Sequence, residues 1–470
     1  MKSSHPLFAS SLAALLLAAC GTQHGAPEGG GSATSNSAGL SASSAAAPGS
    51  ARAVDPFKRP YKGASIAAQL GKKLFFDKTL SASGNMACST CHDPNFAYGP
   101  PNGLAAQLGG PKLDQPGTRA APSLRYKEYT PAYADLLDNP DGISAPGPGG
   151  GFTWDGRTNT LAEQAKLPLF SPLEMANAKP ADVVNQVLVA SYAPLFRQVF
   201  PGDAKADPDA ALNAIVASLQ AFQLEDSSFH PYTSKFDLHA GNKIGGAFTA
   251  AEARGIKIYS DPKKGNCFSC HYQGPGINGS SALFTDFSYE GIGVPRNREV
   301  AANSDEKYFD LGICGPARED HLPQEKVQNK FCGMFKTPTL RNLSKRSAFF
   351  HNGAMHSLEQ VIRFYNTRDT HPEIWYPTVG GKAKAKPDAN FPTYGLITTQ
   401  YSGGKLRKYD DLPAHFVANL DPQMPLDGRK VGSVPPLSEP EIKDLICFLG
   451  TLEDGYVPPA TPPKSGPCVN

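Results

Sequence analysis

Two copies of the motif CxxCH constrain the fold of this 470-residue chain more than any other sequence feature. The copies consist of Cys88, Cys91 and His92, and of Cys267, Cys270 and His271. This spacing lets two thiols add to the vinyl groups of one haem while the adjacent imidazole reaches the iron. A zinc site would need a second Cys/His pair beside each motif, and the sequence has none. We therefore expect two covalently bound haem c groups.

Residues 1–20 have the features of a bacterial export signal. Lys2 is followed by a mostly apolar stretch, residues 7–19, which is too short to span a bilayer as a mature helix. The stretch ends in Leu-Ala-Ala before Cys20, which resembles a lipoprotein signal; a plain secretory signal is the alternative. Residues 21–54 are rich in Gly, Ser and Ala, as in a flexible tether. We expect a periplasmic protein that contacts a membrane, with the outer membrane favoured, through a lipid anchor only.

The charge balance and the other cysteines are compatible with an exported globular protein. Lys and Arg number 45 against 43 Asp and Glu, so no excess of positive charge favours a nucleic-acid partner. The four cysteines that follow Cys20 and lie outside the motifs favour two disulfides in an oxidising compartment, with catalytic thiols as the alternative. The sequence-local pairing is Cys314 with Cys332, and Cys447 with Cys468.

Helical signals dominate the remainder of the chain. Apolar residues at helical spacing precede the first motif, and capping boxes precede the second motif and open a C-terminal helix. The residues concerned are Ile66, Leu70 and Leu74; Thr249 and Glu252; and Ser438 and Glu441. Helical periodicity also marks residues 181–200 and 209–225, and no run of alternating strands is evident.

We therefore expect a mainly α fold made of two cytochrome c-like haem domains with long irregular loops. A similar helix–CxxCH unit occurs twice, which suggests a duplication. The predicted boundaries are 55–235 for the N-terminal domain, 236–457 for the C-terminal domain and 458–470 for a Pro-rich tail.

A series of short words, in order along the chain, resembles the bacterial di-haem cytochrome c peroxidase/MauG family. They are FTWDGR at 152–157, LAEQ at 161–164, SPLEM at 171–175, TPTLRN at 337–342, FHNG at 350–353 and LEQ at 358–360. The resemblance covers about residues 65–455. It implies two cytochrome c-like domains with one haem each: an N-terminal haem that reacts with hydrogen peroxide and a C-terminal haem that handles electrons.

The resemblance also assigns roles to individual residues. His92 and His271 match the proximal ligands of the N-terminal and C-terminal haems, and Trp154 matches a tryptophan between the haems that relays electrons. Gln164 and Glu174 match a pair above the peroxide site. A carboxylate there can carry a proton between the two peroxide oxygens, and a neutral amide can hold the bound oxygen by a hydrogen bond.

The sequence departs from the peroxidase pattern at the first haem. Many di-haem peroxidases place a blocking histidine after the first motif, but no histidine occurs between Asp93 and Phe229. We therefore expect the sixth position of the first haem to be open or occupied by water, as in MauG.

The second departure concerns the sixth ligand of the C-terminal haem. Tyr365 stands where peroxidases with a high-potential haem have a methionine, and it matches a tyrosine ligand of MauG. A phenolate stabilises oxidised iron, which favours storage of oxidising equivalents. Met355, Met424 and, more remotely, His356 are alternative ligands. Tyr365 also belongs to a helical apolar stripe and could be an ordinary core residue.

The resemblance leaves two further questions open. The family often binds Ca²⁺ through an asparagine, but the matching residues 119–122 read Arg-Ala-Ala-Pro, which weakens such a site without excluding it. The partner of the C-terminal haem would be a small cytochrome c or cupredoxin donor if the protein is a peroxidase. It would be a protein substrate if the enzyme is MauG-like. A non-catalytic electron carrier is a remote alternative, and a homodimer is compatible with the family.

Overall fold

The computed structural model of the chain describes residues 63–276, 279–321, 328–461 and 463–470. The predicted signal, Cys20 and the tether lie outside the described residues, as do residues 55–62 of the predicted first domain. These assignments therefore stay predictions. No helix in the described part of the chain is long and apolar enough to cross a membrane.

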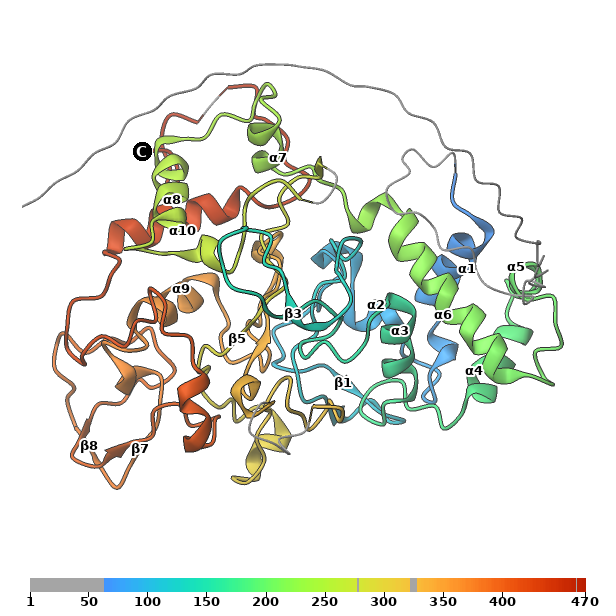
Figure 1. Cartoon of the computed structure of the whole chain (residues 1–470), viewed down its shortest axis with the longest axis horizontal. Helices are drawn as coiled ribbons and strands as arrows, with labels where there is room; N and C mark the ends of the chain where they lie inside the picture. Colours follow the sequence, from blue (N-terminus) through green and yellow to red (C-terminus); the bar gives the residue numbers. More distant parts are fainter. Residues whose placement is uncertain (1–62, 277–278, 322–327, 462) are drawn as a thin grey trace, which may run out of the picture. The chain divides into compact units, whose positions relative to one another are not determined.

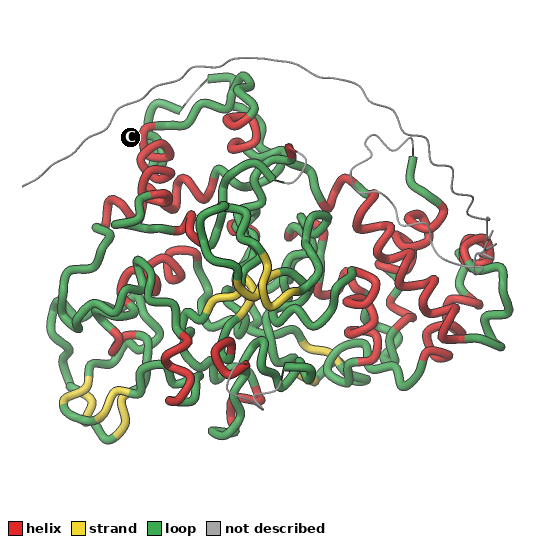
Figure 2. The backbone as a smooth tube through the Cα atoms, in the orientation of Figure 1, coloured by secondary structure: helices red, strands yellow, loops and turns green. Residues whose placement is uncertain are grey.

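Helices separated by long loops make up most of the regular structure (Figures 1 and 2). The α-helices are α1 (Ile66–Phe75), α2 (Cys88–Cys91), α3 (Leu161–Phe170), α4 (Pro180–Val189), α5 (Ala193–Val199), α6 (Pro208–Glu225), α7 (Lys235–Ala240), α8 (Ala250–Ser260), α9 (Leu358–Thr367) and α10 (Glu439–Gly450). The mainly α fold class is thus confirmed.

The strands are short and pair only two by two, all antiparallel. The pairs are β1 (Leu108–Gly109) with β2 (Gln115–Pro116), β3 (Ala134–Leu137) with β4 (Gly147–Gly149), β5 (Tyr289–Glu290) with β6 (Phe335–Lys336), β7 (Thr378–Val379) with β10 (Lys405–Leu406), and β8 (Lys382–Ala383) with β9 (Tyr401–Ser402). They fasten loops together and form no extended sheet.

Helices α1, α3 and α4 pack against α6, and α5 packs against α1 and α4 (Figure 1). Their shared core includes Leu74 and Phe75 of α1 and Phe222 of α6. Gly71 allows α1 to approach α6 closely, because a Cβ built there would lie 1.9 Å from the Ser218 carbonyl oxygen.

A second group consists of α8, α9 and α10, with Tyr259, Phe284 and Phe448 in its core. Gly255 in α8 repeats the close contact, since its Cβ would lie 2.1 Å from the Asp444 carbonyl oxygen in α10. The expected capping boxes at the starts of α8 and α10 are present. The two hydrophobic groups thus share a glycine-mediated helix crossing, which supports the predicted duplication.

The segment 181–200, expected as one helical stretch, forms two helices. Helix α4 ends at Val189 and α5 begins at Ala193. Pro194 lies in the first turn of α5, where its missing N–H is tolerated, but it could not continue α4. The apolar periodicity runs across this break and therefore did not reveal it.

Both predicted disulfides are confirmed, Cys314–Cys332 and Cys447–Cys468. The second one ties the C-terminal tail to α10. The tail also accepts hydrogen bonds from α8 and its N-cap: Thr249 Oγ1 donates to the Cys468 carbonyl at 2.5 Å and Arg254 Nη2 to the Asn470 carbonyl at 2.9 Å. The end of the Pro-rich tail is thus packed against the C-terminal helices.

Candidate functional site

Each CxxCH motif borders a cavity. The first cavity, of about 360 Å³, is lined by Cys91 and His92 together with Trp154, Gln164 and Glu174. Its volume lies within the range of small-molecule and cofactor sites. Helix α2 carries both cysteines of this motif, and His92 is its C-cap. The structure therefore brings together the four residues that the sequence assigned to the peroxide site and the inter-haem position, with Cys91 of the haem motif beside them.

His92 is oriented as a metal-binding imidazole. Its Nδ1 lies 3.1 Å from the Tyr98 carbonyl oxygen. A carbonyl only accepts hydrogen bonds, so the proton is on Nδ1 and the lone pair of Nε2 is available to a metal. Burial lowers the pKa of His92 to about 4, which keeps the ring neutral at pH 7.

His271 has the same arrangement at the second motif, where the 3₁₀ helix η4 (Cys267–Ser269) carries the first cysteine. Its Nδ1 lies 3.2 Å from the Phe284 carbonyl oxygen and 3.1 Å from that of Pro338. Burial lowers its pKa to about 4. The imidazoles at both motifs therefore have the tautomer that a haem iron requires.

The motif cysteines are free in the structure and are poor nucleophiles as they stand. Burial raises the pKa of Cys88, Cys91 and Cys267 to about 12 and that of Cys270 well above its ordinary value. Redox-active cysteines show the opposite shift. This argues against a redox-active CxxC. The interpretation as haem attachment rests on the CxxCH spacing.

Gln164 and Glu174 reach the first cavity from α3 and from the turn that follows it. The turn is fixed by two backbone hydrogen bonds, from Glu174 N to the Ser171 carbonyl at 3.0 Å and from Gly110 N to the Glu174 carbonyl at 2.7 Å. Desolvation by the surrounding protein raises the pKa of Glu174. A hydrogen bond from the Ser171 hydroxyl and the positive charge of Arg157 oppose this shift. A carboxyl group that faces a cavity can accept and release a proton during a reaction.

Trp154 lies between the two cavities and lines both of them, as do Lys336, Thr337 and Pro338. Its indole Nε1 donates to the Ala120 carbonyl at 2.8 Å, and its own carbonyl accepts from Lys336 N at 2.9 Å. The indole is therefore held within the wall that separates the two cavities.

The residue after Trp154 stabilises this wall electrostatically. Asp155 is fully buried and accepts from Arg119 Nη1 and Arg157 Nη1, both at 2.7 Å. Burial opposes ionisation of Asp155, but the two guanidinium groups outweigh it and lower its pKa to about 2. The sequence analysis did not assign this role to Asp155, although it lies in the FTWDGR word.

Four cationic side chains line the first cavity: Arg119, Lys127, Arg157 and Lys336. Burial and the nearby Arg346 lower the pKa of Lys127 to about 8, and burial together with Lys127 lowers that of Lys336 well below its ordinary value. Buried cations are costly unless an anion compensates them. The propionate groups of a haem would supply such anions, so this lining fits the cofactor. These residues are scattered in sequence and carry no motif that would have identified them.

The second cavity, of about 180 Å³, is lined by Cys267, Cys270 and His271 and by two of the candidate sixth ligands, Tyr365 and Met424. Met355 is fully buried in a separate hydrophobic cluster around Phe349 and Trp375. His356 is exposed, with its Nδ1 3.2 Å from the Ser347 carbonyl. Neither of them lines this cavity.

Several known proteins are similar to this chain in sequence and in fold. A profile of the family described as di-haem cytochrome c peroxidase matches residues 65–243. The methylamine utilization protein MauG of Paracoccus denitrificans is 31% identical over 334 residues, which cover 69% of this chain and 78% of that protein. The chain belongs to the di-haem cytochrome c peroxidase/MauG family. It is an enzyme of the di-haem cytochrome c peroxidase type.

Two other relatives support the same assignment. The cytochrome c551 peroxidase of Nitrosomonas europaea is 28% identical over 314 residues, covering 66% of this chain and 75% of that protein. The crystal structure of the di-haem peroxidase BthA from Burkholderia thailandensis has a TM-score of 0.71 and 32% identity, covering 86% of this chain and 89% of that chain. Family membership implies two haem groups.

In this chain, Arg119 lies in the segment where the family's calcium-binding asparagine is expected, and its side chain binds carboxylates. The guanidinium of Arg119 donates to Asp155 and, through Nε and Nη2, to Asp310 at 2.6 and 2.7 Å. These carboxylates are therefore engaged by an arginine. Within the described ranges, no group of three or more His, Cys, Asp or Glu side chains could hold a metal ion.

Proposed function

We propose that the protein reduces hydrogen peroxide at the haem bound by His92, with electrons that arrive through the haem bound by His271. The observation that carries this proposal is that Glu174 and Gln164 share one cavity with His92. The overall reaction consumes one peroxide, two protons and two electrons and releases two waters. The haem supplies the iron that binds peroxide and takes up the oxidising equivalents.

The side chains of this cavity would handle the protons. Glu174 would take a proton from one oxygen of peroxide and pass it to the other, which leaves as water. Gln164 donates a hydrogen bond from its amide to the peroxide and stays uncharged throughout. Trp154, in the wall between the cavities, would relay electrons.

The proton role of Glu174 is tested with Glu174→Gln, which keeps the shape of the side chain and removes its basicity. We expect both haems to remain attached and peroxide consumption to slow at least tenfold, as measured by stopped-flow absorbance. Glu163→Gln is the matched control, because Glu163 lies in α3 next to Gln164, caps the start of that helix and does not line the cavity. Unchanged turnover in Glu174→Gln would contradict the assignment.

A MauG-like reaction on a partner protein is the second candidate. It is favoured by Tyr365 in the second cavity and by the absence of a histidine between Asp93 and Phe229. In that case the oxidising equivalents are stored and then used on a protein side chain. The two functions differ in their electron donor: a small cytochrome c or cupredoxin for the peroxidase, and a protein substrate for the MauG-like enzyme.

Electron paramagnetic resonance distinguishes a MauG-like enzyme from a peroxidase. A high-spin and a low-spin ferric signal that both disappear after one equivalent of peroxide, before any reductant is added, would favour the MauG-like enzyme. Two low-spin signals that stay unreactive until half-reduction would indicate a reductively activated peroxidase with a blocked first haem.

The cellular context is also part of the proposal. We place the two haem domains at 55–235 and 236–457, exported to the periplasm and held by a lipid on Cys20. Labelling cells with a radioactive fatty acid tests the anchor: the label should enter the wild-type chain and be absent from Cys20→Ser.

A further inference from the structure

The four residues Pro-Ser-Leu-Arg at 122–125 reappear as Pro-Thr-Leu-Arg at 338–341. One copy follows each CxxCH motif. Each copy also lies beside the histidine of its own motif: Pro122 lines the first cavity together with His92, and the Pro338 carbonyl lies 3.1 Å from His271 Nδ1. The repeat therefore belongs to both candidate haem sites.

A carbonyl acceptor of each histidine belongs to a residue with an unusual backbone conformation. Tyr98 at the first site and Phe284 at the second both have φ of 55°, in the left-handed region that non-glycine residues rarely occupy. Such a conformation persists only where the surroundings impose it. Both aromatic side chains are buried, Tyr98 stacked on Phe229 with ring centroids 3.8 Å apart and Phe284 against Phe236 at 4.8 Å.

The hydroxyl group of each repeat fixes this strained segment. Ser123 Oγ donates to the Ala97 carbonyl at 2.6 Å, directly before Tyr98. Thr339 Oγ1 donates to the Leu283 carbonyl at 2.6 Å, directly before Phe284. The hydroxyl groups in turn accept from the backbone N–H of the arginines of the repeats, at 3.1 and 3.2 Å. Each hydroxyl thus holds the peptide unit directly before the one that presents the acceptor carbonyl to the histidine.

We propose that Ser123 and Thr339 are matched positioning residues, each of which sets the strength of the proximal histidine ligand, and hence the reduction potential, of its own haem alone. The proposal rests on the assignment of His92 and His271 as proximal ligands. A well-aligned hydrogen bond from Nδ1–H to a carbonyl increases the basicity of the imidazole, which stabilises ferric iron. When the hydroxyl is removed, the acceptor carbonyl loses its alignment and the potential rises.

The test compares Ser123→Ala with Thr339→Val, which is isosteric with threonine. Reduction potentials are measured by spectroelectrochemistry, and the iron–histidine stretch of each ferrous haem by resonance Raman spectroscopy. We expect Ser123→Ala to raise the potential and lower the stretching frequency of the N-terminal haem only. Thr339→Val should do the same to the C-terminal haem only. The conservative variants Ser123→Thr and Thr339→Ser keep the hydroxyl and should restore wild-type values.

The crossed design separates positioning from a general loss of structure. A shift of both haems in either variant, or of neither haem in both variants, would overturn the proposal. If one variant does not fold, the other still decides the outcome, since each is expected to act on one haem. Peroxide consumption by the wild-type protein tests the proposed function separately, because the potentials are measured without peroxide.

Discussion

Single side chains at both haem sites are controlled by what their neighbours do to charge and hydrogen bonding. Carbonyl acceptors keep His92 and His271 in one tautomer, while the protein around Glu174 raises its pKa. At Asp155 and Asp237, by contrast, arginines overcome the effect of burial. Neighbouring groups therefore shift the pKa of a carboxyl group upward at one position and downward at another.

The permanent anions predict how stability falls in acid. Burial opposes ionisation of Asp155 and Asp237, but Arg119 with Arg157 and Arg341, respectively, lower each pKa from 3.8 to about 2. A depressed folded-state pKa stabilises the protein above the unfolded-state value, and this stabilisation is lost as pH falls through the folded-state value. We expect the free energy of unfolding to drop between pH 4 and pH 2, measured by urea denaturation of the holoprotein.

Comparison of the variant Asp155→Asn with the wild type tests this acid dependence. It should lower stability at pH 7 and flatten the pH dependence between pH 4 and pH 2. A variant with the full wild-type acid dependence would show that another group is responsible.

Another prediction about single side chains concerns the sixth ligand of the C-terminal haem. Tyr365→Phe should change the low-spin signal of the C-terminal haem in electron paramagnetic resonance, because a phenolate ligand is lost. Met424→Leu is the matched variant, since Met424 lines the same cavity. If Met424→Leu changes the signal and Tyr365→Phe does not, the thioether is the ligand.

At the scale of elements, the sequence predicted the helices next to the motifs well, because apolar spacing and capping boxes are local signals. It missed the break between α4 and α5, where the apolar spacing continues across Pro194. It also missed the basic lining of the first cavity, since Lys127 and Lys336 meet only after folding. The assigned residues His92, Gln164 and Glu174 do share a cavity, because the family words that identified them encode that arrangement.

The crossing of α1 and α6 depends on the missing side chain of Gly71. Alanine favours helix over glycine by roughly 0.5–1 kcal/mol, but here the added Cβ would overlap the Ser218 carbonyl. We expect Gly71→Ala to destabilise the protein by about 1–3 kcal/mol in chemical denaturation, as for other overpacked contacts. Gly450→Ala is the control, because no atom lies within 4 Å of its Cβ position, and it should be neutral or stabilising.

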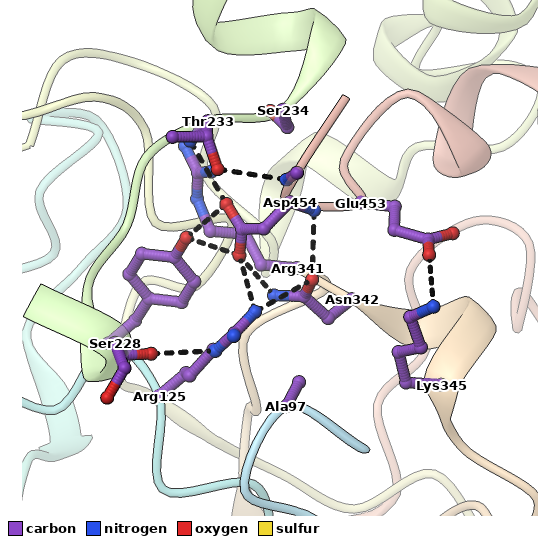
Figure 3. A network of polar contacts seen from close by, with 12 residues as sticks. Ala97, Arg125, Ser228, Thr233, Ser234, Arg341, Asn342, Lys345, Glu453 and Asp454 are labelled. Atoms are coloured by element: carbon purple, nitrogen blue, oxygen red, sulfur yellow. Dashed lines mark hydrogen bonds and ion pairs between the residues drawn. The ribbon is translucent and has the colours of Figure 1, made fainter. Parts of the chain in front are cut away.

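For the whole molecule, one buried carboxylate joins segments from both predicted haem domains (Figure 3). Asp454 accepts from Tyr126 Oη at 2.6 Å, Arg125 Nη1 at 3.1 Å, Asn342 Nδ2 at 2.6 Å and Thr233 N at 3.1 Å. Arg125 is the last residue of the first repeated segment, and Asn342 directly follows the second one. Asp454 therefore links the two candidate haem sites. Its side chain is only 4% exposed, which makes the loss of any partner costly.

Asp454→Ala would leave the guanidinium of Arg125 and the amide of Asn342 without their shared acceptor. Removing one partner of a buried ion pair typically costs about 3–5 kcal/mol, so we expect a fall of that size in the free energy of unfolding. Glu453→Ala is the neighbouring control. Its ion pair with Lys345 is solvent-exposed and should cost less than about 1 kcal/mol.

Since Asp454 connects the two sites, its loss should also change how unfolding proceeds. Absorbance of the two haems should follow one transition in the wild type and separate transitions in Asp454→Ala, whereas a single shared transition in both proteins would show that other contacts couple the domains.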